Sequence, residues 1–276
     1  MLTKRPHGAS TGGRKLSGRP SAQPSAAAIW ARRGILVAIV LGAWQVAVVT
    51  GAAPGLLPAV DDVAVAFLGV FGRPEFWQAL VQTISAALTG VAIATAVGVP
   101  VGLLLGGIPV AERAARLVLD FGRSFPVIAL LPVLILMMGA SWRMEVLVVS
   151  LAAVWPILVQ SLYGAQQMTS SAREMTRSYR IPRLLAFRRV LLPGALPMIS
   201  TGLRIAVAIA LLVAVAVEVL SQTPGLGRLI TLAQGGNRWD LAVAYLVLIG
   251  LFGWAVTSAL AWAEGRLLRW NRQGEA

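Results

Sequence analysis

The chain contains no cysteine and one histidine, His7, among its 276 residues. Without cysteine it has no disulfides, no thiolate chemistry and no cysteine-based metal site. A single histidine supplies neither a histidine-rich zinc site nor a Ser-His-Asp triad. The phosphate-binding pattern G-x-x-x-x-G-K-[ST] is also missing, so we expect no ATP site of the usual kind on this chain. The sequence therefore predicts a protein that is not an enzyme, with no catalytic residues, metal or bound cofactor.

Charged residues are also scarce. They make up 13% of the chain, about half of the roughly 25% found in soluble domains. Hydrophobic residues reach 57% and the mean hydropathy is +0.77, which together predict a membrane protein. The net charge of +13 would suggest nucleic acid in a soluble protein. In a membrane protein it can set topology instead, because Lys and Arg mark cytoplasmic loops.

Apolar runs long enough to cross a bilayer, which takes about 20 residues, recur along the chain. We predict six spans, at 33–51, 79–107, 115–138, 144–165, 195–220 and 241–263. Residues 1–28 are rich in Ser, Gly, Pro, Lys and Arg and predict a disordered basic tail. The first span is interpreted as an uncleaved anchor rather than a signal peptide. The fold class is thus an all-α polytopic membrane protein, with residues 29–276 forming one transmembrane domain.

The distribution of Lys and Arg predicts the orientation. An even number of spans puts both termini on one side. If that side is the cytoplasm, the outside loops hold only Arg73, Arg143, Arg228 and Arg238. The tails and the inside loops hold all the other basic residues except Arg123 and Arg204, which fall within spans. This asymmetry predicts an N-in, C-in topology and places the loop 165–194 in the cytoplasm.

That loop contains "EMTRSYRIPRLLAFRRVLLP", residues 174–193. We expect a first helix that Pro182 stops, because the residue before a proline avoids the α region. A second short helix should carry Phe187 on its apolar face and end at Pro193. One interpretation of this helix–break–helix loop is a basic segment lying on anionic lipid. The other is a docking platform for a soluble cytoplasmic partner, with Phe187 as the apolar anchor and arginines around it.

The loop resembles the cytoplasmic signature loop of binding-protein-dependent ABC importer permeases. The family pattern runs Glu-Ala-Ala, three residues, Gly, then a hydrophobic stretch that closes in Leu-Pro. Aligned on its final proline, Glu174, Phe187, Leu192 and Pro193 match the pattern, while Met175 and Thr176 replace the alanines. The residues expected to dock the ATPase subunit are Glu174, Arg177, Arg180, Phe187, Leu192 and Pro193. Arg180 occupies the glycine position. Because arginine adopts a positive φ less cheaply than glycine, we expect the turn to differ locally, with Pro182 supplying the break.

The resemblance extends over residues 35–265. "FGRSFPVIALLPVLILMMG" (121–139), "TPGLGRLI" (223–230) and the segments 77–106 and 191–220 are similar to the sulfonate, nitrate and taurine branch. The resemblance implies a multi-pass permease of the bacterial inner membrane that imports a small organic or inorganic anion. It also implies a separate ATPase chain carrying ATP and Mg, a periplasmic or lipid-anchored substrate-binding protein, and a second permease. The arginine at position 180 favours a heterodimer.

Small residues repeat every four positions along the second span: Gly90, Ala94, Gly98, Gly102 and Gly106. Because small residues at this spacing let helix backbones approach closely in lipid, we expect a contact face with another helix or another permease. The alternative is a lipid-facing helix whose glycines give flexibility.

Arg123, Arg204 and Glu218 are charged residues within the predicted spans. A charge inside the bilayer costs at least about 2.5–3.5 kcal/mol, so Arg123 and Arg204 each need a reason. Structural pairing near the inner mouth, with Asp120 neutralising Arg123, is one explanation, and anion binding is the other. Glu218 lies near the outer end of the fifth span. We expect it to be a structural hydrogen-bonding group rather than a substrate ligand.

Other function classes fit less well. A channel or secondary transporter tends to show embedded acidic relays or inverted repeats, whereas this sequence predicts at most one deep acid. A membrane enzyme lacks its catalytic groups here. A nucleic-acid binder would interleave aromatics with its basic residues, and the loop offers only Tyr179 and Phe187. We therefore expect lipid and protein partners and no nucleic acid.

Overall fold

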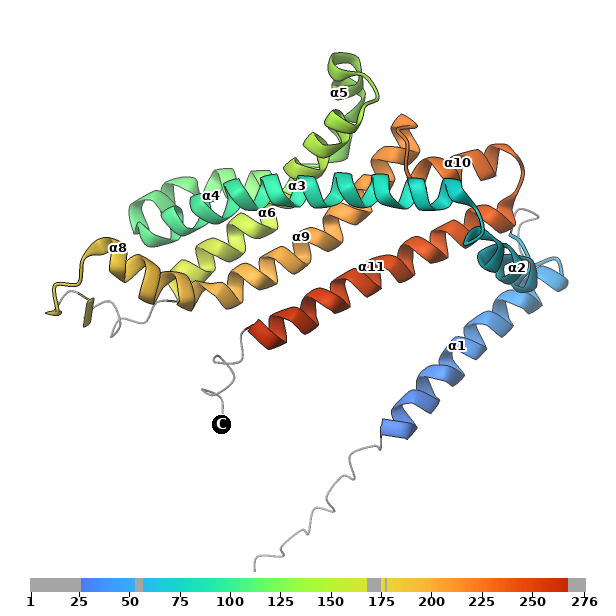
Figure 1. Cartoon of the computed structure of the whole chain (residues 1–276), viewed down its shortest axis with the longest axis horizontal. Coiled ribbons are helices and arrows are strands. Elements are labelled where there is room, and N and C mark those ends of the chain that lie inside the picture. The colour runs from blue at the N-terminus through green and yellow to red at the C-terminus, as the bar shows by residue number, and fades with distance from the viewer. Residues whose placement is uncertain (1–25, 53–56, 168–174, 177, 268–276) are drawn as a thin grey trace, which may run out of the picture.

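The computed structural model describes residues 26–52, 57–167, 175–176 and 178–267, and every regular element in these ranges is a helix. Four long helices run side by side along the molecule (Figure 1). They are α3 (Pro74–Gly107), α6 (Trp142–Gln166), α9 (Leu192–Ser221) and α11 (Trp239–Leu267). The prediction of an all-α fold is confirmed. The predicted tail, residues 1–28, lies outside the described residues up to position 25.

Shorter helices lie outside these four long helices, and two of them mark the two ends of the bundle. They are α1 (Ala26–Val49), α2 (Val60–Val70), α4 (Pro109–Ser124), α5 (Leu131–Met138), α8 (Arg183–Ala186) and α10 (Leu226–Gly235). A 3-10 helix (Val127–Leu130) precedes α5, and a π-helix (Phe187–Leu191) joins α8 to α9. We call the two ends the α8 end and the α10 end. The predicted orientation puts the α8 end in the cytoplasm.

Five helices are long and apolar enough to cross a membrane. The predicted third span, 115–138, is not one straight helix. Its two halves, Arg113–Ser124 and Val127–Met138, are bent by 74°, and the chain reaches six spans only if this pair counts as one. The bend follows from Pro126, because the residue before a proline avoids the α region, and Phe125 has an extended ψ of 125°.

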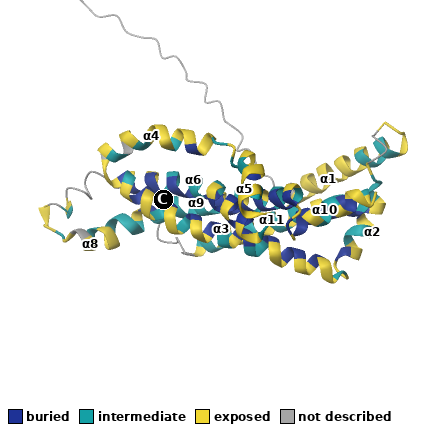
Figure 2. Ribbon diagram, turned by 90° about the horizontal axis from the view of Figure 1, so that it is seen from above, coloured by how far each residue is buried: buried dark blue, intermediate teal, exposed yellow. Residues whose placement is uncertain are grey.

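The largest cluster of buried residues lies where α3, α6 and α9 meet (Figure 2), and a second cluster joins α2, α3, α10 and α11. The small residues of α3 face α6 directly. A Cβ atom on Gly90 would overlap the side chain of Val149, and one on Gly102 would overlap the carbonyl of Leu158. Gly98 and Gly106 meet α6 in the same way, and Ala94 is buried. The stripe is therefore a close helix–helix contact within this chain.

The first helix stands apart from the bundle (Figure 1). The membrane-length part of α1, Trp30–Val49, has none of its residues buried. Its C-terminal part is tied to the start of α2 by side-chain hydrogen bonds. The indole of Trp44 donates to the carbonyl of Pro58 at 3.1 Å, and Gln45 accepts from the amide of Val60 at 2.8 Å. These bonds hold one end of α1, while its apolar surface faces outward.

Candidate functional site

The loop with the five arginines keeps a left-handed turn. Met175 and Thr176 are helical, and Arg180 has a φ of 50°. The amide of Ile181 donates to the carbonyl of Thr176 at 3.0 Å, which is the long hydrogen bond of a Schellman helix end. The expectation that arginine would change the turn is therefore wrong. The hydrogen bond that closes the helix offsets the cost of a non-glycine residue in this conformation, about 1–2 kcal/mol.

Pro182 starts the second helix instead of stopping the first. The amides of Leu185 and Ala186 both donate to its carbonyl, at 2.9 and 3.0 Å. The first helix has already ended at the left-handed Arg180, two residues earlier. A proline suits the start of a helix because its missing N–H has no partner there in any case. The predicted break is present, but Arg180 makes it.

The second helix does not end at Pro193, contrary to our expectation. From Leu184 the helical backbone continues through the π-helix into α9 as far as Ser221. A proline inside a helix lacks one donor and its ring clashes with the preceding turn. Here the wider π turn precedes it, with the amide of Leu192 donating to Phe187 five residues back. The second half of the loop, from Leu184, and α9 therefore form one continuous helical rod.

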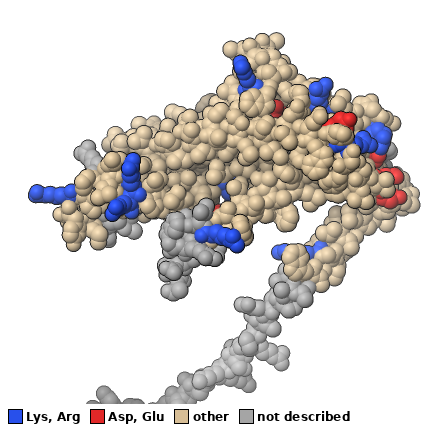
Figure 3. Space-filling model, in the orientation of Figure 1, with Lys and Arg blue, Asp and Glu red and all other residues tan. Residues whose placement is uncertain are grey.

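Four of the six residues that we predicted for partner docking are described, and two of these lie on the surface of this rod and turn. Phe187 is 41% exposed and Arg180 is exposed, whereas Leu192 and Pro193 are half-buried. Glu174 and Arg177 lie outside the described residues. Arg188 and Arg189 are exposed next to Phe187. Figure 3 shows basic side chains at the α8 end, whereas the acidic side chains visible on this face gather mainly near α2 and α10.

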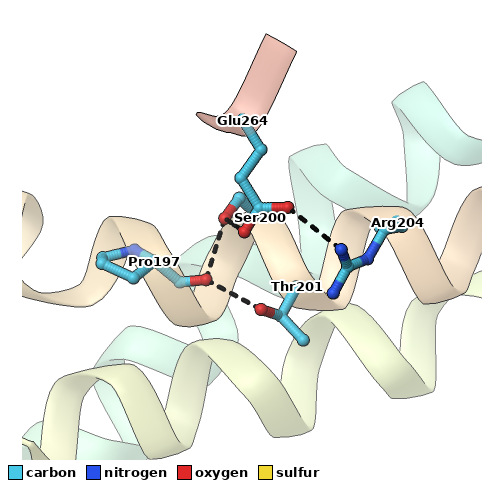
Figure 4. Close-up of polar contacts among 5 residues, drawn as sticks. All are labelled: Pro197, Ser200, Thr201, Arg204 and Glu264. Atoms are coloured by element: carbon cyan, nitrogen blue, oxygen red, sulfur yellow. Dashed lines mark hydrogen bonds and ion pairs between the residues drawn. The ribbon is translucent and has the colours of Figure 1, made fainter. Parts of the chain in front are cut away.

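Arg204 of α9 is paired with Glu264 of α11 (Figure 4). The guanidinium lies 3.6 Å from the carboxylate, and the hydroxyl of Ser200 donates to the same carboxylate at 2.9 Å. The Arg204 side chain is 42% exposed. The pair joins two spans at the half of the bundle nearer α8, as structural pairing requires.

Arg123 lies in the last turn of α4 and forms an ion pair with Asp120 at 2.8 Å, both side chains being more than half exposed. Beside them α4 and α6 enclose a cavity of about 320 Å³. Its polar lining includes Arg116, Asp120, Arg123, Tyr163 and Gln166. The cavity places Arg123 where a small polar solute could reach it, so pairing and anion binding both remain compatible with its position.

Glu218 lies in the last turn of α9 and is fully buried. It accepts hydrogen bonds from the hydroxyl of Thr83 at 2.6 Å and from the amide of Gly227 at 2.7 Å. A second glutamate, Glu145 of α6, is 1% exposed and is hydrogen-bonded to Glu218. The prediction of one deep acid at most is therefore wrong. Sequence reasoning missed Glu145 because an acid in the first turn of a helix is ordinary.

A family comparison decides what kind of protein this is. Residues 98–272 match the family described as "Binding-protein-dependent transport system inner membrane component". The match includes the docking loop, α9 and the segment around Gly227. The chain belongs to this family of ABC transporter permeases. The predicted resemblance is confirmed.

Curated relatives and a solved structure agree with this family. The chain is 30% identical to the "Putative aliphatic sulfonates transport permease protein SsuC" of Escherichia coli (strain K12), over 84% of this chain and 89% of the relative. It is 26% identical to the "Taurine transport system permease protein TauC" of the same organism, over 86% and 88%. A chain of the MetNI methionine ABC transporter, in an inward-facing conformation, shares the fold. Its TM-score is 0.61 at 19% identity, covering 71% of this chain and 97% of that one.

The features described above fall into two groups according to where they lie along α9. The exposed loop and the Arg204–Glu264 pair lie toward its beginning, and the buried glutamates lie at its end. The two predicted charges that could meet a solute, Arg123 and Arg204, are both partly exposed. Glu218, fully buried and hydrogen-bonded, has no surface open to a solute.

Proposed function

We propose that this permease imports a small organic anion, of the sulfonate or taurine kind, using ATP hydrolysed on a separate chain. The observation that carries the proposal is the exposed Phe187, next to Arg188 and Arg189, on a loop continuous with a membrane span. An apolar side chain ringed by charge is typical of a docking surface for a soluble partner. In this proposal the ATPase, carrying ATP and Mg, binds this loop from the cytoplasm.

The continuous helix from Leu184 to Ser221 gives the loop a mechanical connection to the bundle. A displacement of the loop reaches α9 directly, and α9 packs against α3 and α6 through buried residues such as Ala206 and Ala210. Alternating access then needs only that the ATPase binds one arrangement of the bundle more tightly than the other. A second permease would complete the pathway, and a substrate-binding protein would deliver the solute at the α10 end.

The choice of an anion rests on charge and on relatives. The chain carries a net charge of +13, and Arg123 lines a polar cavity. Two relatives are named for aliphatic sulfonates and taurine, and others for the inorganic anions nitrate and bicarbonate. A sulfonate is a permanent anion that guanidinium groups bind well. The inner membrane of a bacterium is the location that such a system implies.

Co-purification with the ATPase subunit tests the docking part of the proposal. Phe187→Asp should leave membrane insertion intact and abolish recovery of the ATPase, because a charge replaces the apolar anchor. Phe187→Leu is the matched control, since it keeps an apolar side chain at the position. If the Asp variant binds the ATPase as well as the parent protein, the docking role of this loop is wrong.

A secondary transporter is the alternative, and the buried pair of Glu145 and Glu218 is the observation that favours it. Embedded acids often relay protons in that class. Uptake by vesicles containing the permease alone, driven by a proton gradient without ATP, would support the alternative. Uptake that requires both the ATPase and ATP would exclude it.

A further inference from the structure

Two glutamates from different spans meet in the interior at the α10 end. Glu145 lies in the first turn of α6 and Glu218 in the last turn of α9. Their exposed fractions are 1% and 0%. Their carboxyl groups are hydrogen-bonded to each other. Among the described residues, neither forms an ion pair with a basic side chain. Both groups are therefore held away from water without a cation to balance them.

The partners of Glu218 are those of an ionised carboxylate. Its Oε1 atom accepts from the hydroxyl of Thr83, and its Oε2 atom accepts from the amide of Gly227. The latter amide belongs to the first turn of α10, where backbone N–H groups lack helical partners and carry partial positive charge. Thr83 also accepts from the amide of Leu226 at 3.0 Å. Its single proton has two acceptors in reach, Glu218 at 2.6 Å and the carbonyl of Ala79 at 3.1 Å, and the shorter contact is the one with Glu218. Both carboxylate oxygens are thus occupied by donors.

The surroundings of Glu145 are different. Its Oε1 atom has no hydrogen-bond partner, and its carboxyl group bonds to Glu218 and to the hydroxyl of Thr223. Within the described part of the chain, no backbone N–H donates to it. Two ionised carboxylates in contact in a dry interior repel strongly, and such pairs keep one proton. A proton on Glu145 removes the repulsion and gives a strong O–H···O⁻ hydrogen bond.

We propose that Glu145 and Glu218 form a buried proton-binding site, in which Glu145 holds the proton and donates it to ionised Glu218. The site joins α3, α6, α9 and the start of α10 through one cluster of hydrogen bonds. Loss of the proton places two negative charges in contact. It therefore loosens the segment 223–227 from the bundle.

Other charged groups on the elements packed around the site are oriented elsewhere. Glu75 of α3, Arg143 of α6 and Arg228 of α10 are exposed. On α11, Asp240 is paired with Arg238 at 2.8 Å, and the buried Tyr245 stacks on Phe76. Within the described residues, none of them forms an ion pair with either glutamate. The titration of the site should therefore be governed by the two glutamates themselves.

The assignment of the proton predicts unequal effects of removing each charge. Glu145→Gln replaces a neutral donor with another neutral donor, so folding should be nearly unchanged. Glu218→Gln removes the negative charge and places an amide NH₂ either against the amide of Gly227, which is a donor, or against Thr83, whose proton must then turn to the carbonyl of Ala79. That variant should lower the Tm of the purified full-length protein by about 2–10 °C. If Glu145→Gln lowers the Tm as much as Glu218→Gln, the assignment is overturned.

Infrared spectroscopy of the full-length protein in detergent or nanodiscs tests the proton directly and needs no variant to fold. At about pH 7, where exposed glutamates are ionised, we expect a carbonyl-stretch band of a protonated carboxyl group. The band should disappear in Glu145→Gln and persist in the matched control Glu264→Gln, whose carboxylate is ion-paired. Absence of the band in the parent protein, or its persistence in Glu145→Gln, would overturn the proposal.

The pH dependence of stability gives a second readout. The folded protein holds a proton that an exposed glutamate releases above about pH 4, so the Tm should fall as pH rises from there and level off once the buried proton is lost. Glu145→Gln should flatten this dependence, and Glu264→Gln should not. A cation bound between two ionised glutamates is the competing arrangement. It would give no protonated-carboxyl band and a Tm that rises with Na⁺ but not with choline, and that result also overturns the proposal.

Discussion

Toward its two ends, α9 carries Arg204 and Glu218, and these charged residues are accommodated in different ways. Arg204 is 42% exposed and pairs loosely with Glu264 at 3.6 Å. Glu218 is fully buried and accepts two hydrogen bonds shorter than 2.8 Å. About 21 Å of helix separates the two positions. The same helix therefore stabilises one charged residue, Arg204, by partial exposure and an ion pair, and the other, Glu218, by hydrogen bonds to both carboxylate oxygens.

The difference follows from desolvation. A partly exposed ion pair keeps some hydration, so its partner can be distant and its net contribution is small. A buried carboxylate has lost all hydration and is stable only if every oxygen finds a donor. The packing around it must then be exact enough to hold those donors, and even a methyl group disturbs it. The α10 end should therefore be rigid and sensitive to substitution, and the α8 end tolerant.

The largest effect should come from adding one methyl group at the α10 end. A Cβ atom on Gly227 would overlap the carbonyl of Val215 and crowd the side chain of Glu218. Because a backbone atom cannot move aside, Gly227→Ala should cost about 3 kcal/mol of stability. Gly235→Ala in the same helix is the matched control, since nothing lies within 4 Å of its Cβ position. Thermal unfolding in detergent measures both, and equal midpoints would contradict the tight packing.

Removal of one hydroxyl at the same end should have the next largest effect. Thr83→Val leaves the Oε1 atom of Glu218 without its hydroxyl donor and the amide of Leu226 without an acceptor. The loss should be about 1–3 kcal/mol. Thr95→Val, on the same helix, is the control because that hydroxyl donates only to the carbonyl of Val91 in its own helix. A Thr83 variant as stable as the Thr95 variant would mean that the network contributes little.

A change at the α8 end should stabilise the turn. Arg180 adopts a φ of 50°, so Arg180→Gly relieves backbone strain of about 1 kcal/mol. Hydrogen exchange of the amides of Tyr179 and Ile181, which donate to Met175 and Thr176, should become slower in this variant and faster in Arg180→Val, because a β-branched residue fits the conformation poorly. Faster exchange in the glycine variant would show that the arginine side chain itself holds the turn.

The smallest effect should come from the exposed pair. Glu264→Gln removes the charge opposite Arg204 but keeps an oxygen that can accept from Ser200. We expect a loss of about 0.5 kcal/mol that shrinks at high salt. Thermal unfolding at low and high ionic strength measures it, with Glu75→Gln, an exposed glutamate, as the control. If the loss of stability were as large as that of Thr83→Val, the α8 end and the α10 end would not differ in their sensitivity to substitution.

Several features could be predicted from residues close together in the sequence. The long apolar runs predicted helices that are present, and the four-residue repeat of small residues predicted a close contact that α6 provides. Asp120 and Arg123, three residues apart, form the expected ion pair. These features depend on helical periodicity alone. The docking role of Phe187 stays a prediction. The same holds for Glu174 and Arg177, which lie outside the described residues.

The errors arose at prolines and at long-range contacts. Pro182 and Pro193 were both expected to stop helices, yet one begins α8 and the other follows a π turn inside a continuous helix. Pro126, which the prediction ignored, is the site of the 74° bend. A proline removes one donor and one conformation, and its neighbours decide whether the helix ends, bends or adjusts.

The sequence by itself determined the membrane location, the helical class, the family and the surplus of positive charge, because composition and local periodicity carry this information. Only the tertiary structure decided which charges are buried and what satisfies them. Glu145 and Glu218 are 73 positions apart, and Thr83 and Gly227 come from two further helices. Packing at the α10 end brings these groups together in the dry interior, where a carboxylate must have donors and a second carboxyl group needs a proton.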